Sequence, residues 1–346
     1  MPGEVLSEAL EERSMTQAEL ARRMARPVKT ISEIVTGKTA ITADTAIQLE
    51  RTLGISAGIW LGLESHYREH QARARDRAAL LAHTSWLNKF PIAALVRRGI
   101  LTRGAPKTDQ ASELLSYFGV SSPDGWQQQW GQFAASYRLS KGARVSTYSV
   151  SVWLRQAERD AEGIELPAFS IEGLRGAASD LRELTRFSIL GAAINRAQEI
   201  LRTSGVGFMV TEGIVGAPAS GAVMRVRKNP WIVLTLRFRT ADQFWFSLFH
   251  EIGHILEGLR RPEVVEYLDD IGTRELGEEF ANLFARETLI PQPVLDAWLS
   301  DHVPNSSAVL AFADEIGVAP GIVVGRLQRE GVVGWSSSLR TLKQDV

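Results

Sequence analysis

A short apolar stretch that carries two histidines and a glutamate, WFSLFHEIGH from Trp245 to His254, places the tightest limit on the fold. The apolar residues from Phe244 to Leu256 have helical spacing and cover most sides of the expected helix, so this helix should be buried. Two imidazoles and a carboxylate inside a buried helix are costly unless they find partners. The fold must therefore bring polar groups or a metal ion to the middle of this helix.

The spacing of the two histidines suits a metal ion. His250 and His254 share one face of the helix because they are four residues apart, which places them about 5–6 Å from each other. Glu251 is rotated from the first histidine by about 100°. It could therefore take a proton from a water molecule that zinc activates, without being a ligand itself. The alternative is a histidine pair satisfied by neighbouring residues, with Glu251 at the surface.

A third ligand is needed, since catalytic zinc sites often combine two histidines with a glutamate. The stretch ELGEEFANLFARETLIP, Glu275 to Pro291, predicts a second helix with an apolar side. Glu278 and Asn282 share one face of it, so Glu278 would bind one zinc ion per chain and Asn282 would hydrogen-bond a free histidine nitrogen. Glu279 is the alternative ligand, although it is rotated away from Asn282. If there is no metal site, Glu278 is expected to be an exposed, solvated acid.

Composition limits the class of protein. A chain of 346 residues predicts two or three domains, and the absence of cysteine excludes a disulfide framework and suits the cytoplasm. The net charge of −1 argues against a general polyanion binder, so any nucleic-acid site should be a local patch. The first residues lack the apolar region of a signal peptide, and no apolar run is long enough for a membrane span. We therefore expect a cytoplasmic protein without a membrane partner.

The pattern along the chain predicts a mostly α protein with a small β-sheet, of the α+β class. Residues 1–72 are expected to form short helices, residues 73–165 a helical connector, and residues 166–346 a mixed domain. A long helix is expected from Leu181 to Thr203. Three strands, with hairpin-like turns between them, are expected at GVGFMVTE, SGAVMRVR and WIVLTLRF.

The C-terminal motifs resemble a known peptidase family. Peptidases with H-E-x-x-H and a later E-x-x-x-D helix are gluzincins, and the sequence FWFSLFHEIGHILEG followed by EEFANLFARETLIP resembles the ImmA/IrrE metallopeptidases. In that comparison Glu278, Asn282, Phe284, Ala285 and Pro291 match the family pattern. The resemblance implies a gluzincin-like domain and a protein substrate, because members of that family cleave DNA-binding repressors. No residue in the sequence identifies itself as the group that stabilises the oxyanion.

The N-terminal region resembles the Cro/repressor-type helix-turn-helix domains, and the HigA antitoxin branch in particular. The matching stretches are LARRM, PVKTISEIVTGK and TADTAIQLERTLGI, together with a capping box in which Thr16 caps a helix and Glu19 reaches back. The resemblance places the recognition helix at Val28 to Val35. The residues implied to contact bases are Lys29, Thr30 and Ser32, and those implied to contact phosphates are Gln17 and Lys38.

Two functions follow from these patterns. In the first, the chain binds a double-stranded DNA operator, as a homodimer, and its zinc domain cleaves a repressor, a toxin or itself when a signal arrives. In the second, the chain is an antitoxin-type repressor whose peptidase fold only senses a ligand or holds a partner such as a toxin. The intact H-E-x-x-H favours the first, since a scaffold would not require Glu251.

Overall fold

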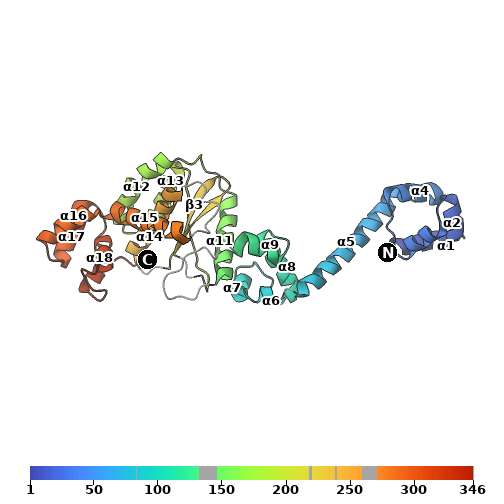
Figure 1. Cartoon of the computed structure of the whole chain (residues 1–346), viewed down its shortest axis with the longest axis horizontal. Coiled ribbons are helices and arrows are strands. Elements are labelled where there is room, and N and C mark those ends of the chain that lie inside the picture. The colour runs from blue at the N-terminus through green and yellow to red at the C-terminus, as the bar shows by residue number, and fades with distance from the viewer. Residues whose placement is uncertain (83, 132–145, 218–219, 238–239, 259–270, 346) are drawn as a thin grey trace. The chain divides into compact units, whose positions relative to one another are not determined.

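The computed structural model describes the chain except for residues 83, 132–145, 218–219, 238–239, 259–270 and 346. The chain forms two compact units, which are coloured along the sequence in Figure 1. Unit 1 comprises Met1–Leu87 with Gly104–Glu113, and unit 2 comprises Asn88–Arg103 with Leu114–Val346. The secondary structure is mostly helical with one small sheet, which confirms the expected α+β class. The domain limits at residues 72 and 165 stay predictions.

Unit 1 begins with a bundle of short helices around its own apolar core. They are α1 (Pro2–Glu12), α2 (Gln17–Arg23), α3 (Val28–Val35) and α4 (Ala43–Leu53), followed by the 26-residue α5 (Ala57–Ala82). One side chain from each of the five helices is completely buried: Leu6, Leu20, Ile31, Leu49 and Trp60. Because Trp60 belongs to this core, the first turns of α5 complete the bundle. Residue 72 lies inside α5, so the helix runs across the expected boundary.

The helix ends in unit 1 follow local sequence signals. The Thr16 hydroxyl accepts a hydrogen bond from the Glu19 amide at 3.1 Å, as a side-chain cap of α2 should. The Glu19 carboxylate does not complete the expected capping box, because it accepts from Arg23 Nε at 3.1 Å, one turn further along. Gly54 ends α4 with a positive φ of 74°, which favours glycine.

The middle of the chain is helical. Its elements are α6 (Thr84–Leu87), α7 (Ile92–Arg97), α8 (Lys107–Phe118), α9 (Pro123–Trp126), the π-helix η1 (Gln127–Gly131) and α11 (Thr147–Glu162). In unit 2 an aromatic cluster joins several of them. Trp126 stacks on Tyr148 with ring centres 4.7 Å apart, and Phe90 meets Tyr148 edge-on at 4.9 Å. Aromatic side chains therefore make up much of the core of this region.

A three-stranded sheet follows in unit 2. The strands are β1 (Gly207–Thr211), β2 (Gly221–Val226) and β3 (Asn229–Thr235), in the order β1-β3-β2. The expected strands are confirmed, but only one hairpin is: β2 pairs antiparallel with β3, whereas β1 pairs parallel with β3. The central β3 is the most apolar of the three, and four of its side chains, Trp231 to Leu234, are fully or almost fully buried.

Helices precede and follow the sheet. The long helix expected from Leu181 to Thr203 is wrong, because α12 (Ile171–Glu183) and the 3-10 turn η2 (Leu184–Arg186) end before α13 (Leu190–Thr203) begins. After the sheet come α14 (Ala241–Gly258), α15 (Ile271–Leu289), α16 (Gln292–Asp301), α17 (Ser306–Ile316), α18 (Pro320–Arg329) and the 3-10 turn η4 (Ser338–Leu342). The main core of unit 2 takes side chains from α12 to α18 and from the sheet.

No single helix in the described part of the chain is long and apolar enough to cross a bilayer. Taken together, α17 and α18 meet the length and composition limits, but they are bent by 111° at their break, and core helices pass the same test.

Candidate metal centre and helix-turn-helix surface

The histidine helix α14 is buried on most of its circumference, as its sequence predicts. Phe244, Leu248, Phe249 and Ile252 are completely buried in the main core of unit 2. The helix begins directly after Thr240 and ends at Gly258, in agreement with the expected limits. Because these apolar residues fix the helix in rotation, the remaining face with the two histidines can point in only one direction.

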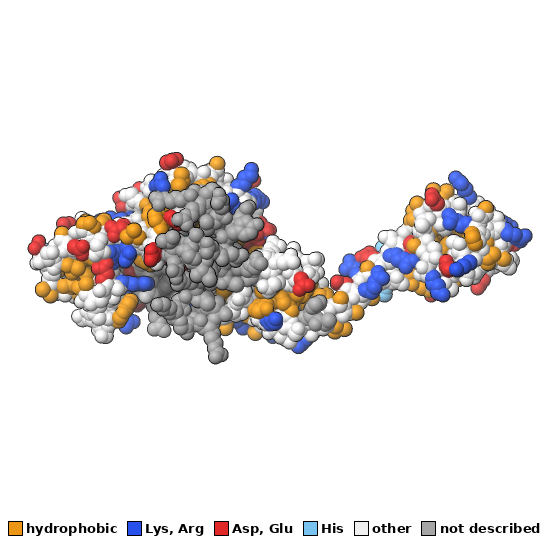
Figure 2. Space-filling view, in the orientation of Figure 1, with side chains coloured by type: hydrophobic (Ala, Val, Ile, Leu, Met, Phe, Trp, Pro, Cys, Tyr) orange, Lys and Arg blue, Asp and Glu red, His pale blue; other side chains and the backbone are white. Residues whose placement is uncertain are grey.

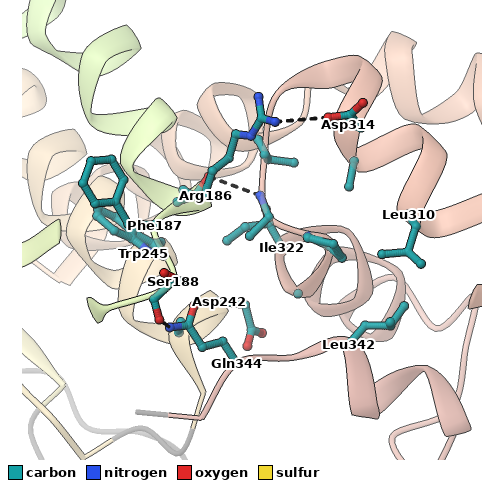
Figure 3. Close-up of a pocket in the computed structure, with 17 residues that line it drawn as sticks. Arg186, Phe187, Ser188, Asp242, Trp245, Leu310, Asp314, Ile322, Leu342 and Gln344 are labelled. Atoms are coloured by element: carbon teal, nitrogen blue, oxygen red, sulfur yellow. Dashed lines mark hydrogen bonds and ion pairs between the residues drawn. The ribbon is translucent and has the colours of Figure 1, made fainter. Parts of the chain in front are cut away.

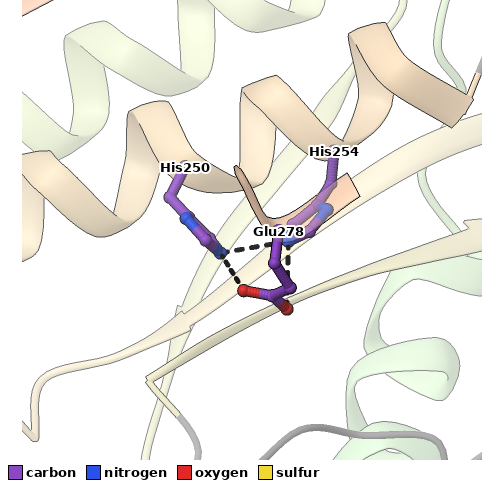
Figure 4. A group of neighbouring side chains, drawn as sticks. All are labelled: His250, His254 and Glu278. Carbon is purple, nitrogen blue, oxygen red and sulfur yellow. Dashed lines mark hydrogen bonds and ion pairs between the residues drawn. The ribbon is translucent and has the colours of Figure 1, made fainter. Parts of the chain in front are cut away.

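Three side chains converge on that face (Figure 4). The Nε2 atoms of His250 and His254 are 3.0 Å apart. The carboxylate of Glu278, from α15, places one oxygen 3.6 Å from His250 Nε2 and the other 3.7 Å from His254 Nε2. All three residues are partly buried, and among the described residues they form the one group of acidic and histidine side chains compact enough to hold a metal ion.

A close approach of two helices makes this convergence possible. At Gly253, between the two histidines, an added Cβ would lie 2.7 Å from Cα of Ala281 in α15. No real Cβ tolerates that distance to backbone, so the pairing of α14 with α15 depends on glycine here. Glu278 lies one helical turn before Ala281 and is thereby held opposite both histidines.

The electrostatics keep both imidazoles neutral. Burial lowers the pKa of His250, while Glu278 and a hydrogen-bonding interaction with Asn282 act in the opposite direction. Burial, and to a lesser extent His250, lowers the pKa of His254 to about 3. A neutral imidazole is the form that binds a metal, so the ring nitrogens are available as ligands near neutral pH.

The donor set fits a zinc ion. Ligand atoms at tetrahedral positions and normal zinc distances are about 3.3 Å apart, and the separations of 3.0, 3.6 and 3.7 Å lie on either side of that value. Two neutral histidines and one carboxylate leave a fourth position for a reacting molecule. Glu279, the alternative ligand, is exposed and does not belong to the group.

Glu251 is the buried carboxylate of the site, with 7% of its surface exposed. Burial, followed by the charge of Glu278, raises its pKa to about 8. Its side chain lies against the start of β2, where a Cβ on Gly221 would come within 2.6 Å of Glu251 Oε1. The surface position considered for Glu251 is therefore wrong. The glycine provides the space in which this carboxylate lies.

Asn282 lies beside the histidines, on the same side of α15 as Glu278. It influences the pKa of His250 through hydrogen bonding, which places it near the ring as expected. However, Nδ1 of His250 is buried and has no hydrogen-bond partner with good geometry in the described part of the chain. The predicted bond from Asn282 to a free ring nitrogen therefore stays a prediction.

In unit 1, α3 has the limits predicted for the recognition helix, Val28–Val35. Lys29 and Ser32 are exposed on it, and Thr30 is partly exposed. The side chain of Lys29 is 85% exposed, and its Nζ lies 3.8 Å from Glu33 Oε1, too loose a contact to restrain it. The three residues therefore remain accessible to an external partner.

The two expected phosphate contacts lie outside α3. Gln17 is the first residue of α2, where free backbone N–H groups favour an anion, and Lys38 is exposed in the turn after α3. Figure 2 shows Lys and Arg side chains interspersed with acids on the visible face of unit 1. On this face the basic side chains do not form a continuous positive surface.

Comparisons with known proteins agree with this division. Residues 6–60 match the helix-turn-helix family model, and residues 217–328 match that of the IrrE N-terminal-like domain, peptidase family M78. The uncharacterized HTH-type transcriptional regulator YddM of Escherichia coli (strain K12) is 38% identical over 64 residues, which are 18% of this chain and 68% of that protein. The chain belongs to the helix-turn-helix transcriptional regulators. Its C-terminal unit carries the IrrE-like domain.

Sequence reasoning overlooked two glycines of this regulator. Gly253 stands in the middle of the mostly apolar stretch that predicts α14, which is a signal of close backbone approach. Gly221 opens a strand, another position where glycine often marks a close neighbour. Neither signal identifies the neighbour, since Ala281 and Glu251 are brought there by tertiary packing.

The regulator also has a cavity of about 360 Å³ in unit 2, away from the histidines (Figure 3). It is lined by the start of α14, by α17, by the start of α18 and by residues 185–188, 342 and 344. Arg186 pairs with Asp314 at 3.1 Å on one side, and Gln344 donates to the carbonyl of Ser188 at 2.6 Å on the other. Neither His250 nor any other residue of the metal group lines this cavity.

Proposed function

We propose that this helix-turn-helix regulator is also a zinc-dependent endopeptidase, and that cleavage of a repressor, a toxin or the chain itself changes transcription. The observation that carries the proposal is the group of His250, His254 and Glu278 beside the buried carboxylate of Glu251. A buried carboxylate with a pKa raised to about 8, next to three metal-binding groups, is typical of a residue that transfers a proton in catalysis.

In this proposal three residues hold the ion and a fourth moves the proton. A zinc ion held by His250, His254 and Glu278 would supply the Lewis acidity that polarises a peptide carbonyl and makes water a better nucleophile. The oxygen of the attacking water bonds to the carbonyl carbon, and Glu251 takes the proton that the water gives up. The same carboxyl then gives the proton to the leaving amine as the C–N bond breaks. The raised pKa suits the second step, in which the carboxyl donates, and the positive charge of a bound zinc ion would favour the ionised form that the first step needs.

The DNA-binding half of the proposal depends on α3. A recognition helix reads bases with side chains near its N-terminus. Lys29 and Thr30 lie in the first half of α3 and Ser32 follows at its middle, and all three are accessible to a partner. Gln17 and Lys38 would contact phosphates. Operators of this fold usually consist of two half-sites, so we propose a homodimer, which light scattering of the purified protein will test.

A second function is supported by the cavity of about 360 Å³ at the start of α14. Its size falls within the range of small-molecule sites. In this alternative the IrrE-like domain senses a ligand or holds a toxin and does not cleave. The same cavity is compatible with a peptidase that a ligand regulates, so cleavage itself is the property that separates the two functions.

The deciding experiment compares Glu251→Gln with wild type. The variant should keep its zinc and its DNA affinity but lose peptide cleavage by about 10²–10⁴-fold, because glutamine cannot accept the proton. Zinc content is measured by elemental analysis, and derepression of the regulated promoter is measured in cells under the inducing condition. Equal derepression in Glu251→Gln and wild-type cells would show that proteolysis is not the switch.

A matched pair on α15 tests the metal ligands. Glu278→Ala should abolish stoichiometric zinc, whereas Glu279→Ala, one residue along and exposed, should retain it. Unchanged zinc in Glu278→Ala would remove Glu278 from the ligand set.

A further inference from the structure

A positively charged side chain lies close to the candidate metal centre without being part of it. Arg329 is the last residue of α18 and is exposed. Its guanidinium carbon lies 5.0 Å from the centre of the Phe246 ring, and that ring stacks on His250 with centres 6.2 Å apart and planes inclined by 28°. Two ring contacts therefore connect Arg329 to a candidate ligand of the metal.

The charge of Arg329 lies near the site and is not neutralised there. In the part of the chain that the structure describes, Arg329 has no hydrogen bond or ion pair. By contrast, Arg326 on the same helix bonds Glu330 and Gln292, each at 2.5 Å, and is buried.

The packing around Arg329 leaves its hydrogen-bonding groups available. Contact with the face of Phe246 restrains a guanidinium while leaving its N–H groups free to bind in their own plane. Such a fork is suited to a carboxylate, which it can hold with two bonds. A cation in the last turn of α18 also favours the helix dipole, but that effect would not require the side chain to extend over Phe246.

We propose that Arg329 is a specificity residue that selects substrates with an aspartate or glutamate side chain next to the bond to be cut. This inference rests on the proposed peptidase function. Among the described residues Arg329 makes no hydrogen bond or ion pair with the metal-binding residues, so the role assigned to it is in the choice of substrate.

The test uses the zinc-loaded full-length protein and synthetic peptides. A mixed peptide library read by mass spectrometry first identifies cleaved sequences, and matched peptides then carry Glu, Gln or Lys at each position near the cut. The measured quantity is the ratio of kcat/KM for the Glu peptide to that for the Gln peptide. At one position this ratio should favour Glu, and Arg329→Gln should lower it about 5-fold or more. High salt should lower it in wild type as well.

Two further variants sharpen the comparison. Arg329→Glu should prefer the Lys peptide at the same position, which a purely structural role would not produce. Arg196→Gln, at an exposed arginine of α13 that pairs with Glu199, should leave the ratio unchanged. A fall in kcat/KM for all peptides alike in Arg329→Gln, with an unaltered ratio, would overturn the proposal and point to a role in the reaction itself.

A failure of the proposed function is distinguishable from a failure of this inference. If the wild-type protein cleaves no peptide, fluorescence anisotropy with zinc-loaded Glu251→Gln still compares binding of labelled Glu and Gln peptide pools. Preferential binding of the Glu pool that disappears in the double variant Glu251→Gln, Arg329→Gln would support selection by Arg329 without cleavage. Equal binding of both pools in Glu251→Gln would overturn it.

Discussion

Glu251 should make the metal-free protein less stable as the pH rises, and Glu251→Gln should remove that effect. In the folded chain burial and Glu278 hold the Glu251 pKa at about 8, whereas in the unfolded chain it returns to 4.5. The unfolded state therefore gives up the proton first. Below pH 4.5 the carboxyl is protonated in both states and does not lower the free energy of unfolding. Between pH 4.5 and pH 8 the free energy of unfolding falls progressively, because only the unfolded state loses the proton.

The magnitude follows from the two pKa values. They differ by about 3.5 pH units, and each unit corresponds to about 1.4 kcal/mol. At pH 8 the carboxyl of Glu251 should therefore lower the free energy of unfolding by about 4 kcal/mol relative to an uncharged side chain of the same shape. At pH 5 the difference should be less than about 1 kcal/mol, because the folded state still keeps its proton.

The assay is urea unfolding of chelator-treated, full-length protein, followed by tryptophan fluorescence at pH 5 and pH 8. The transition of unit 2 should be more stable in Glu251→Gln than in wild type at pH 8 and nearly equal at pH 5. Glu279→Gln, at an exposed position, should change stability little at either pH. Adding zinc to wild type should reduce the difference, since the ion favours the charged carboxylate. The same advantage of Glu251→Gln at both pH values would refute the reasoning.

Three further predictions concern packing, DNA and a helix cap. Gly253→Val should lower the stability of unit 2 by about 1–3 kcal/mol and reduce bound zinc, because its side chain meets the backbone of α15; full zinc content and normal unfolding would contradict the close approach. Lys29→Ala with Thr30→Ala should weaken binding to the operator by about 1–3 kcal/mol for each lost base contact, measured by fluorescence anisotropy, and an unchanged affinity would exclude α3 as the reading helix. Thr16→Ala should lower the stability of unit 1 by about 1 kcal/mol in thermal unfolding, since the Glu19 amide loses its acceptor; no loss would mean that water replaces the cap.

The parts of the fold that the sequence predicted correctly depend on local signals. The limits of α14 follow from turns and from apolar spacing, and β3 is visible as a continuous apolar run. The limits of α3, by contrast, came from the family resemblance. The break between η2 and α13 was not predicted, because the sequence there contains neither glycine nor proline. The parallel pairing of β1 with β3 was missed for a related reason. The order and direction of strands depend on the path of the chain between them, and no short stretch of sequence indicates that path.

The candidate site shows the same division. His250 and His254 could be proposed as a pair from their spacing alone, and Glu278 from the class of ligand that such a pair requires. The burial of Glu251 could not, because it depends on the strand that covers it and on the absence of a side chain at Gly221. The position of Arg329 near the site could not be predicted from the sequence. It is 75 residues from His254 and approaches the site through its contact with the ring of Phe246.

The apolar circumference of α14 has a consequence for regulation. Its place in the core is fixed by Phe244, Leu248, Phe249 and Ile252, none of which belongs to the metal group. In a zinc finger, folding and metal binding are one event. Here the core of α14 is built without the metal group, so the chain should fold without zinc. Under the proposed function, withdrawal of zinc would stop the hydrolytic step while leaving the helix-turn-helix unit folded, and each molecule could be switched on again without new synthesis.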